Sequence, residues 1–306
     1  MSLPVREILK LGEKQLLDAG IADAARDSKT LYCYMLDLPP ARIILEYQNV
    51  LSDANCDKYF ALIDRRSSGE PLQYITGSTE FMGLPFKVDP RVLIPRQDTE
   101  VLVEQALSVI KDGSLSGETF AVARREWSVL DLCCGSGAIG VSVAKLAPKT
   151  RVTLSDVSEG ALALAKQNAE ENGVGKNVKL EQGDLFAPFK GRFRSRRFDM
   201  ILCNPPYIAT EVIGTLQTEV KDHEPMSALD GGADGLDFYR RLAAEAGDHL
   251  EKGGVLMMEI GFDQGESVSA LLRESGAFKD IRCLKDLAVL DRGVAARKAA
   301  DRGGKK

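Results

Sequence analysis

The chain has 306 residues, a length that favours two domains, and 44% of them are hydrophobic, which is enough for a globular core. Its formal net charge of -5 provides no overall basic field, which argues against tight, sequence-independent binding to duplex nucleic acid. No stretch approaches the roughly 18 apolar residues of a membrane span, and the first residues lack a signal-peptide pattern, so we expect a cytoplasmic protein.

The six cysteines and two histidines show no spacing that is typical of a metal site. The sequence contains neither a Cys-x-x-Cys pair nor a cluster of cysteine with histidine. We therefore expect reduced thiols and no bound metal.

Residues 1–75 are predicted to form a small helical bundle. Apolar side chains from Val5 to Leu16 recur on one helical face, and a second amphipathic segment covers 31–38 before two prolines end it. Further apolar positions at 59–63 indicate another helix. No pattern typical of catalysis occurs in this region, so we expect it to dock a partner or to stabilise the fold.

Residues 76–97 are predicted to link two domains through a β-hairpin. Residues 80–88 alternate between apolar and polar types around a glycine-containing turn, and 91–94 are another short strand candidate. Asp98 then supplies a side-chain oxygen at the start of a helix. Residues 111–126 are polar and lack a clear period, so we expect a loop there.

Alternating strand and helix patterns predict an α/β domain over residues 98–292, with a parallel sheet covered on both faces. The apolar runs 281–284 and 287–290 would complete this sheet as an edge pair, and the tail, 293–306, is expected to be disordered. The other expected strands are 128–132, 151–155, 178–182, 198–203 and 255–260, and the expected helices are 138–147, 159–171, 236–250 and 263–274.

A glycine-rich loop after the first strand of this domain predicts a site for an adenosine-bearing ligand. Gly135, Gly137 and Gly140 fit the G-x-G-x-x-G pattern between a strand and a helix. Asp156 ends the second strand, where a carboxylate accepts ribose hydroxyls, and Asp184 follows the third, within reach of an adenine amino group. The loop alone leaves a dinucleotide and S-adenosylmethionine both open.

The tetrapeptide Asn204-Pro205-Pro206-Tyr207 directly follows a short apolar strand. Two prolines force the backbone out of the sheet, and their lack of N–H groups leaves nearby carbonyl oxygens free to face a ligand. Asn204 adds an amide, so together these groups could hold a planar –NH2 group by its two hydrogens, with the Tyr207 ring beside it. A simple strand ending followed by a turn is the alternative. The tetrapeptide supplies no acid or base for hydride transfer, which favours S-adenosylmethionine over a dinucleotide.

These residues resemble the class I S-adenosylmethionine-dependent methyltransferases, in which (Asn/Asp)-Pro-Pro-(Tyr/Phe) marks enzymes that methylate planar nitrogen. The chain is more closely similar to the HemK/PrmC family, the glutamine-N5 methyltransferases of peptide chain release factors. The similarity extends over nearly the whole chain and rests on the blocks 69–77, 80–84, 93–100, 204–208, 223–225, 229–236 and 259–261. It implies a helical N-terminal domain, a hairpin linker and a Rossmann-like catalytic domain with a seven-stranded, mostly parallel sheet.

The resemblance also implies the roles of the site residues. Catalysis is assigned to Asn204, Pro205, Pro206 and Tyr207, which would hold the substrate glutamine. S-adenosyl-L-methionine, which becomes S-adenosyl-L-homocysteine, is expected to bind to Cys133, Cys134, Gly135, Ser136, Gly137, Asp156, Asp184, Leu185 and Asn204. Cys133 stands where the family usually has glycine, and Gln97 where many relatives carry proline.

Release factors are the expected protein substrate, with the helical domain as their docking surface and a monomer as the expected state. Nucleic acid is not required. A ribosomal-protein glutamine methyltransferase and a DNA adenine methyltransferase are the alternatives, although the second should carry a basic target-recognition region. A non-catalytic adaptor would be expected to lose the tetrapeptide or the ribose acid. The one basic cluster, 190–197, is expected to be a solvated loop, with contact to an acidic partner or RNA as the alternative.

Overall fold

The computed structural model describes residues 3–121, 124–191, 196–286 and 288–299. The chain divides into two compact units. The first contains Met1–Ser78 together with the short segment Leu216–His223, and the second contains Thr79–Thr215 and Glu224–Lys306. A segment from late in the sequence therefore belongs to the N-terminal unit. Within the described ranges, no helix is long and apolar enough to cross a bilayer.

The first unit is helical, as predicted. Its apolar core includes Leu16, Leu31 and Ile63, which come from three different helices and are fully buried. Ser52 begins one of these helices, because its side chain accepts the backbone N–H of Asn55 at 3.3 Å. The helices are α1 (Val5–Asp18), α2 (Ala24–Met35), α3 (Ile43–Glu46), α4 (Asp53–Ser67), α5 (Leu72–Thr76) and α10 (Thr218–Lys221), and η1 (Pro40–Arg42) is a 3-10 turn.

A buried ion-pair network holds the late segment in the first unit. The guanidinium of Arg66 on α4 donates to Asp27 of α2 at 2.8 Å and to Glu219 of α10 at 2.6 Å. Arg66 and Asp27 are 4% and 1% exposed, so each charge depends on its partner rather than on water. The three side chains therefore tie α10 to the helices of the N-terminal region.

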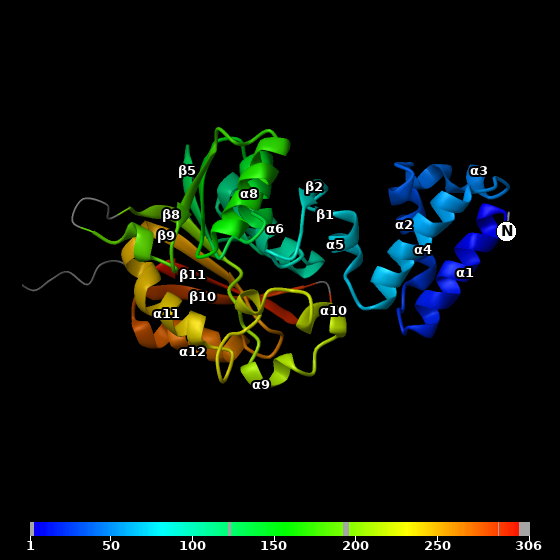
Figure 1. Ribbon diagram of the computed structural model, residues 1–306. Helices are drawn as coiled ribbons and strands as arrows, with labels where there is room; N and C mark the ends of the chain where they lie inside the picture. The colour runs from blue at the N-terminus through cyan, green and yellow to red at the C-terminus, as the bar shows by residue number, and fades with distance from the viewer. Residues whose placement is uncertain (1–2, 122–123, 192–195, 287, 300–306) are drawn as a thin grey trace, which may run out of the picture. The chain divides into compact units, whose positions relative to one another are not determined.

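The second unit is built on a seven-stranded sheet, whose strands and covering helices are labelled in Figure 1. The strand order is β10-β11-β9-β8-β5-β6-β7, and of these seven strands β11 alone runs opposite to the other six. The predicted seven-stranded, mostly parallel sheet is thus confirmed. Its strands are β5 (Trp127–Leu132), β6 (Thr150–Asp156), β7 (Val178–Gln182), β8 (Phe198–Cys203), β9 (Leu250–Glu259), β10 (Phe278–Lys285) and β11 (Asp291–Lys298).

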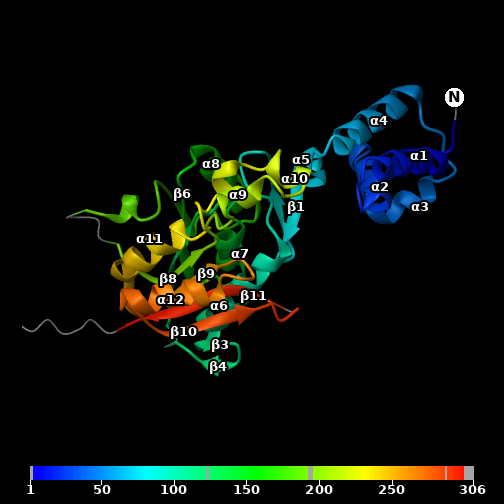
Figure 2. The same cartoon turned by 90° about the horizontal axis from the view of Figure 1, so that it is seen from below.

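Helices cover both faces of this sheet (Figures 1 and 2), because alternate strand residues are apolar on each face. On one face, Val129 and Met257 pack in a core with α6, α7 and α8. On the other, Leu130 and Met258 pack with α11 and α12. The helices are α6 (Glu100–Asp112), α7 (Ala138–Leu146), α8 (Glu159–Glu171), α9 (Thr210–Ile213), α11 (Asp237–Glu245) and α12 (Gly265–Ser275), and the 3-10 turns are η2 (Gln97–Thr99), η3 (Ala187–Phe189), η4 (Met226–Ala228) and η5 (Ala246–His249).

The predicted linker hairpin consists of β1 (Ser78–Phe81) and β2 (Leu84–Lys87). It does not stand apart from the second unit, because Phe81 and Phe86 are buried in the same core as β5 and α6. The segment 91–94 is not a strand, contrary to prediction. Residues 111–126 contain a short ribbon that the sequence pattern did not indicate, formed by β3 (Ser114–Leu115) and β4 (Glu118–Thr119).

Two predictions at the C-terminal end are wrong. Residues 288–290 form a turn rather than a strand, because the Asp286 carboxylate accepts the backbone N–H groups of Ala288 and Leu290. Residues 293–298 belong to β11 and are not disordered, since they pair with β9 on one side and β10 on the other. Position 287 and the end of the predicted tail, 300–306, lie outside the described residues.

Candidate cofactor and substrate site

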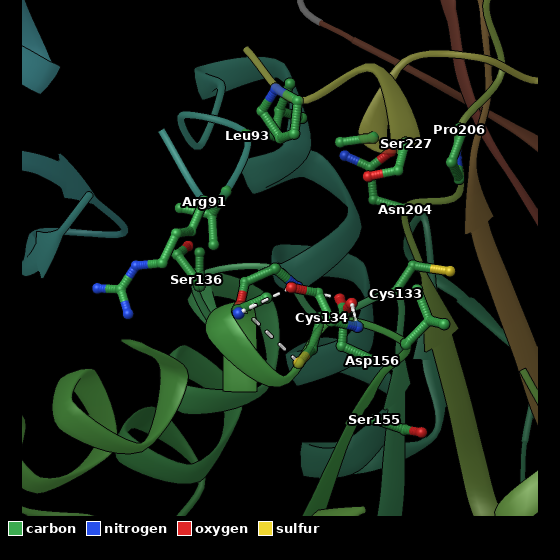
Figure 3. A pocket seen from close by; sticks show the side chains of 18 of the residues that line it. Arg91, Leu93, Cys133, Cys134, Ser136, Ser155, Asp156, Asn204, Pro206 and Ser227 are labelled. Carbon is green, nitrogen blue, oxygen red and sulfur yellow. Dashed lines mark hydrogen bonds between the residues drawn. The ribbon is translucent and has the colours of Figure 1, made fainter. Parts of the chain in front are cut away.

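A cavity of about 520 Å³ opens at the carboxyl ends of β5, β6, β7 and β8. Its volume falls in the range of small-molecule sites, and open α/β sheets bind ligands at this edge. Figure 3 shows Asn204, Pro206 and Ser227 along one side of this pocket, with Cys134 and Asp156 at the loop that follows β5. The structure therefore brings the strand-end residues that the sequence pattern singled out to one cavity.

The loop after β5 is shaped by backbone conformations that favour glycine. Gly135 and Gly137 have φ angles of 52° and 80°, and Cys133 adopts φ 55° in the same left-handed region. Cys133 thus takes the conformation that glycine adopts readily, at a cost of about 1 kcal/mol. Cys133, Cys134, Gly135 and Ser136 line the cavity, whereas Gly137 starts α7 behind it.

Asp156 at the end of β6 holds this loop in place. Its carboxylate accepts the backbone N–H of Gly135 at 2.9 Å and that of Ser158 at 2.9 Å. The side chain also lines the cavity, as predicted for a group that accepts ribose hydroxyls. Asp156 therefore shapes the loop and presents a negative charge to the pocket at the same time.

Asp131 and Gly140 support the loop from below without facing the cavity. The Asp131 carboxyl accepts the Gly140 N–H at 2.9 Å, and complete burial raises the pKa of Asp131 to about 8. A Cβ atom at Gly140 would lie 2.3 Å from the side chain of Leu154. The last glycine of the pattern thus serves close packing of α7 on the sheet.

Asp184 and Leu185 line the cavity at the end of β7, as predicted. The Asp184 carboxylate pairs with Arg241 of α11 at 2.7 Å, and both side chains remain partly exposed. A ligand amino group would therefore meet a carboxylate that already has one charged partner. The sequence pattern did not indicate this pair, because Arg241 is 57 residues away along the chain.

Asn204 faces the cavity with a defined amide orientation. Its Nδ2 donates to the Thr99 hydroxyl at 3.4 Å, which leaves Oδ1 as the side-chain atom available to accept from a ligand. Pro206 also lines the cavity, whereas Pro205 and Tyr207 are not among its lining residues. The Tyr207 hydroxyl instead donates to Glu259 at 3.3 Å, and burial raises its pKa.

Comparison with known proteins places this site in a family. The family model described as "PrmC N-terminal domain" matches residues 7–77, and "Methyltransferase small domain" matches 116–220. The release factor glutamine methyltransferase of Moorella thermoacetica is 39% identical over 290 residues, which are 95% of this chain and 97% of that protein. The protein of the same name from Geobacter sulfurreducens is 39% identical over 293 residues, or 96% of each chain. The chain belongs to the release factor glutamine methyltransferases.

A solved methyltransferase structure has the same fold as this release factor glutamine methyltransferase. The catalytic domain of hMettl16, solved in complex with the MAT2A 3'UTR hairpin 6, has a TM-score of 0.54 over 83% of this chain and 86% of that one. Its sequence identity is 15%, so the similarity concerns the fold alone.

Sequence reasoning missed one wall of this methyltransferase site. The segment from Arg91 to Arg96 lines the cavity, and Figure 3 labels Arg91 and Leu93 on it. Glu224 anchors this segment, since it accepts the Ile94 N–H at 3.1 Å and pairs with Arg96 at 2.5 Å. The Leu-Ile-Pro-Arg block at 93–96 could have indicated this wall, because it is part of the family resemblance. Its apolar residues instead predict a strand over 91–94.

The residues present fit S-adenosylmethionine. The cavity has adequate volume, and no heavy atom lies within 4 Å of the position where a Cβ would stand on Gly135, so the loop backbone is open to a ligand. Asp156 and Asp184 offer carboxylate acceptors, and Leu185 adds an apolar side chain to the lining. This donor and acceptor set suits the hydroxyl, amino and ring groups of an adenosine.

Proposed function

We infer that this protein transfers a methyl group from S-adenosylmethionine to the N5 amide nitrogen of the glutamine in the Gly-Gly-Gln motif of peptide chain release factors. The observation that carries this function is the 39% identity to curated release factor glutamine methyltransferases over nearly the full length of both chains. The ribosomal-protein alternative is not adopted, because these relatives are named for release factors.

The bound cofactor supplies an electrophilic methyl group on a sulfonium. Asp156 would accept the ribose hydroxyls, Asp184 the adenine amino group, and Leu185 would cover the ring. The loop Cys133–Gly137 would surround the methionine part, with Cys133, Cys134 and Ser136 on the cavity side. These assignments stay predictions. They are supported by the position of every one of these residues except Gly137 on the cavity wall.

The amide nitrogen of glutamine is a poor nucleophile, because its lone pair is delocalised into the carbonyl. Asn204 Oδ1 and the Pro205 carbonyl would accept its two N–H bonds, which favours charge development on nitrogen and orients it towards the methyl group. With the amide held in this way, its nitrogen would bond to the methyl carbon as the bond from that carbon to sulfur breaks, and the N-methylated amide would then lose its extra proton to water. Tyr207 would pack beside the amide plane.

The helical unit is proposed to dock the release factor. Four large apolar side chains of this unit are exposed to solvent by more than half: Leu17 by 55%, Ile44 by 69%, Leu45 by 71% and Val50 by 56%. Apolar side chains that remain exposed in this way are available for contact with a protein partner. Replacing Ile44 by Asp should raise the KM for the release factor several-fold while kcat and cofactor affinity stay unchanged. An unchanged KM would place the docking surface elsewhere.

We further propose that the protein acts in the cytoplasm, as a monomer and without nucleic acid. The acidic net charge of -5 supports the absence of a nucleic-acid substrate. In the basic cluster, Lys190 pairs with Glu245 at 2.6 Å, while 192–195 lie outside the described residues. Light scattering on the purified protein tests the monomeric state, and transfer assays with and without nuclease treatment test whether nucleic acid is needed.

The test of function is transfer of a labelled methyl group to a purified release factor. A release factor in which the Gly-Gly-Gln glutamine is replaced serves as the control, with ribosomal protein and DNA as parallel substrates. Label on the intact factor alone is expected. Label only on ribosomal protein or on DNA would overturn the substrate assignment and retain the cofactor chemistry.

Two variants test the roles of the site residues. Asn204→Ala should lose orders of magnitude in turnover and still bind cofactor, because the acceptor for the substrate amide is removed. Asp156→Ala should weaken cofactor binding by roughly 1–3 kcal/mol through lost charged hydrogen bonds. Isothermal titration with S-adenosylhomocysteine measures the affinity, and unaltered binding by the Asp156 variant would remove that residue from the site.

A further inference from the structure

Glu259 lies beside the Asn-Pro-Pro-Tyr tetrapeptide and has no role in the mechanism above. It is the last residue of β9, the strand that pairs with β8, and Cys203 on β8 is in register with Met258 on β9. Asn204 and Glu259 are therefore the next residues along two adjacent strands. The block 259–261 carried the family resemblance in the sequence, yet no chemistry had been assigned to it.

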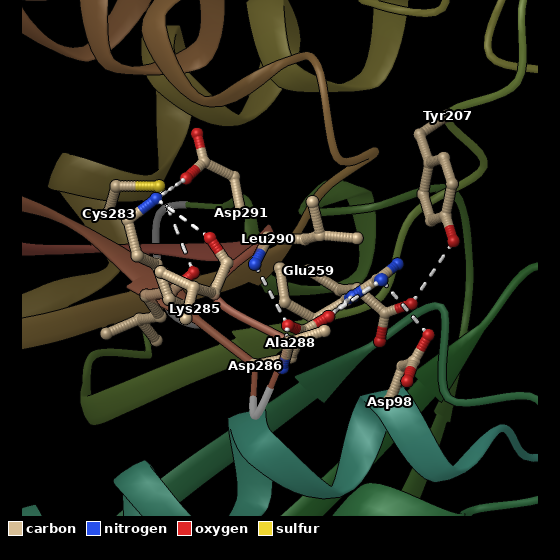
Figure 4. A network of polar contacts seen from close by, with 12 residues as sticks. Asp98, Tyr207, Glu259, Cys283, Lys285, Asp286, Ala288, Leu290 and Asp291 are labelled. Atoms are coloured by element: carbon tan, nitrogen blue, oxygen red, sulfur yellow. Dashed lines mark hydrogen bonds and ion pairs between the residues drawn. The ribbon is translucent and has the colours of Figure 1, made fainter.

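The Glu259 side chain is buried next to Tyr207. It is 2% exposed, and its Oε1 accepts the Tyr207 hydroxyl at 3.3 Å, as Figure 4 shows. Its backbone carbonyl accepts the Tyr239 hydroxyl at 2.8 Å, which fixes the strand end from the α11 side. On the other side of Tyr207, the Gln264 amide donates to the Tyr207 carbonyl at 3.0 Å.

Thr99 connects Glu259 to Asn204. The Thr99 hydroxyl accepts from Asn204 Nδ2 at 3.4 Å and is itself 4% exposed, so its own proton needs an acceptor within the protein. We assign the Glu259 carboxyl as that acceptor, because its Oε2 is buried without another hydrogen-bond partner and hydrogen bonding from Thr99 lowers the pKa of Glu259. The direction of each bond then follows: the Asn204 amide donates to Thr99, and Thr99 donates to Glu259.

We propose that Glu259 is a positioning residue for methyl transfer, which accepts the hydroxyls of Thr99 and Tyr207 and thereby keeps Asn204 Oδ1 turned towards the substrate amide. The inference rests on the proposed function. A reversed Asn204 amide would present its –NH2 group to the –NH2 group of the substrate, and two donors cannot bind each other. Glu259 prevents this reversal, because a Thr99 hydroxyl that donates to Glu259 offers Asn204 only its lone pairs.

The ionisation of Glu259 controls this arrangement. Burial raises the pKa of Glu259 to about 7, opposed by hydrogen bonds from Thr99 and Tyr207 and by the charge of Arg292 on β11. Asp98, which precedes α6, raises it further, and Tyr239 of α11 contacts the same residue. A protonated carboxyl loses acceptor capacity and becomes a donor. Turnover should therefore fall as the pH decreases through about 7.

The test is the Glu259→Gln variant, which keeps the shape but replaces one acceptor oxygen by a donor. We expect kcat for release-factor methylation to fall at least tenfold, with KM and cofactor affinity within twofold of the wild type, and the pH dependence near 7 to disappear. Glu251→Gln, on the exposed part of β9, is the matched control and should be unchanged. Wild-type kcat for Glu259→Gln would overturn the proposal.

Thr99 variants test the connection itself. Thr99→Val should lower kcat as Glu259→Gln does, Thr99→Ser should restore it, and the double variant Thr99→Val/Glu259→Gln should be no worse than either single variant, because both act through one relay. Equal losses for Thr99→Ser and Thr99→Val, or additive losses in the double variant, would contradict the role of the hydroxyl.

NMR of the Asn204 side chain tests the role of Glu259 without any release factor present. Its outcome is therefore independent of whether the proposed substrate is correct. In protein labelled with ¹⁵N-asparagine, the Asn204 side-chain signals are those missing from Asn204→Asp. They should shift with pH around a midpoint near 7 in the wild type and stay constant in Glu259→Gln. No shift in the wild type would refute the relay. An inactive wild type with an intact shift would instead refute the substrate assignment.

Discussion

Glu224 is expected to be the residue whose loss most weakens the cavity wall formed by 91–96. Its side chain is 1% exposed and accepts both the buried Ile94 N–H at 3.1 Å and the Arg96 guanidinium at 2.5 Å. Replacement by alanine removes both acceptors at once. The backbone of the wall would then have an unpaired donor in a site that excludes water.

The size of the stability loss depends on how exposed the two donors, the Ile94 N–H and the Arg96 guanidinium, are to water. Ile94 is 3% exposed, so the loss of its hydrogen bond to a charged group costs about 1.5–3 kcal/mol. The Arg96 side chain is 41% exposed and regains water, so its ion pair contributes at most about 1 kcal/mol. We expect Glu224→Ala to lower the free energy of unfolding by about 2–4 kcal/mol and to weaken cofactor binding roughly fivefold to tenfold.

Urea unfolding followed by tryptophan fluorescence measures this loss. Trp127 is the only tryptophan, is 3% exposed and lies on β5, so it reports on the second unit alone. Glu224→Gln is the matched control, because its amide oxygen still accepts the Ile94 N–H and only the charge is lost. It should cost about 1 kcal/mol.

Two results would refute this reasoning. A Glu224→Ala variant within about 0.5 kcal/mol of the wild type would show that the wall is held by other contacts. Equal losses for the alanine and glutamine variants would assign the stabilisation to the exposed ion pair with Arg96 rather than to the buried Ile94 N–H.

Substitutions at three further residues test the fold. Arg66→Met should destabilise the first unit by about 3–5 kcal/mol, because the buried Asp27 carboxylate keeps only the longer, exposed ion pair with Arg26 at 3.5 Å, and should increase hydrogen exchange across 216–223. Cys133→Val should cost about 1–2 kcal/mol at φ 55°, whereas Cys133→Gly should cost nothing, by urea unfolding. Burial gives Asp131 a pKa of about 8, above its ordinary 3.8, so the folded state binds the extra proton and stability falls as the pH rises from about 4 to 8. Asp131→Asn should remove this fall, on the order of 4 kcal/mol in the difference between urea curves at pH 5 and 9; a parallel decline in both proteins would contradict the assignment.

Patterns that depend on neighbouring residues were sufficient to predict much of the fold. Alternating apolar runs located β5 to β9, and the strand-end positions of Asp156, Asp184 and Asn204 indicated one shared edge, which the cavity confirms. Parallel strands place their carboxyl ends together, so strand order was not needed to bring these residues to one site.

Features that depend on distant contacts could not be predicted in this way. Residues 91–94 are apolar like a strand, but Glu224 removes the Ile94 N–H from any sheet pairing. The tail ends in glycine and lysine, but the apolar Val294–Ala296 within it pair with the distant strand β9. In these two cases a contact from another part of the chain overrides the local pattern. At 288–290 the apolar run forms a turn because the neighbouring Asp286 carboxylate accepts two of its backbone N–H groups.

The helical unit is formed by two separate stretches of the chain, because 216–223 belongs to it together with 1–78. The N-terminal family model ends at residue 77, yet Arg66 of that region has one of its two carboxylate partners, Glu219, far downstream. A chimera that exchanges only residues 1–78 between relatives would take Arg66 from one protein and the segment 216–223 from another. The buried Arg66 guanidinium would then face a segment that did not evolve with it. The exchangeable module is discontinuous, and recombination or domain grafting in this family should preserve function only when both pieces are inherited together.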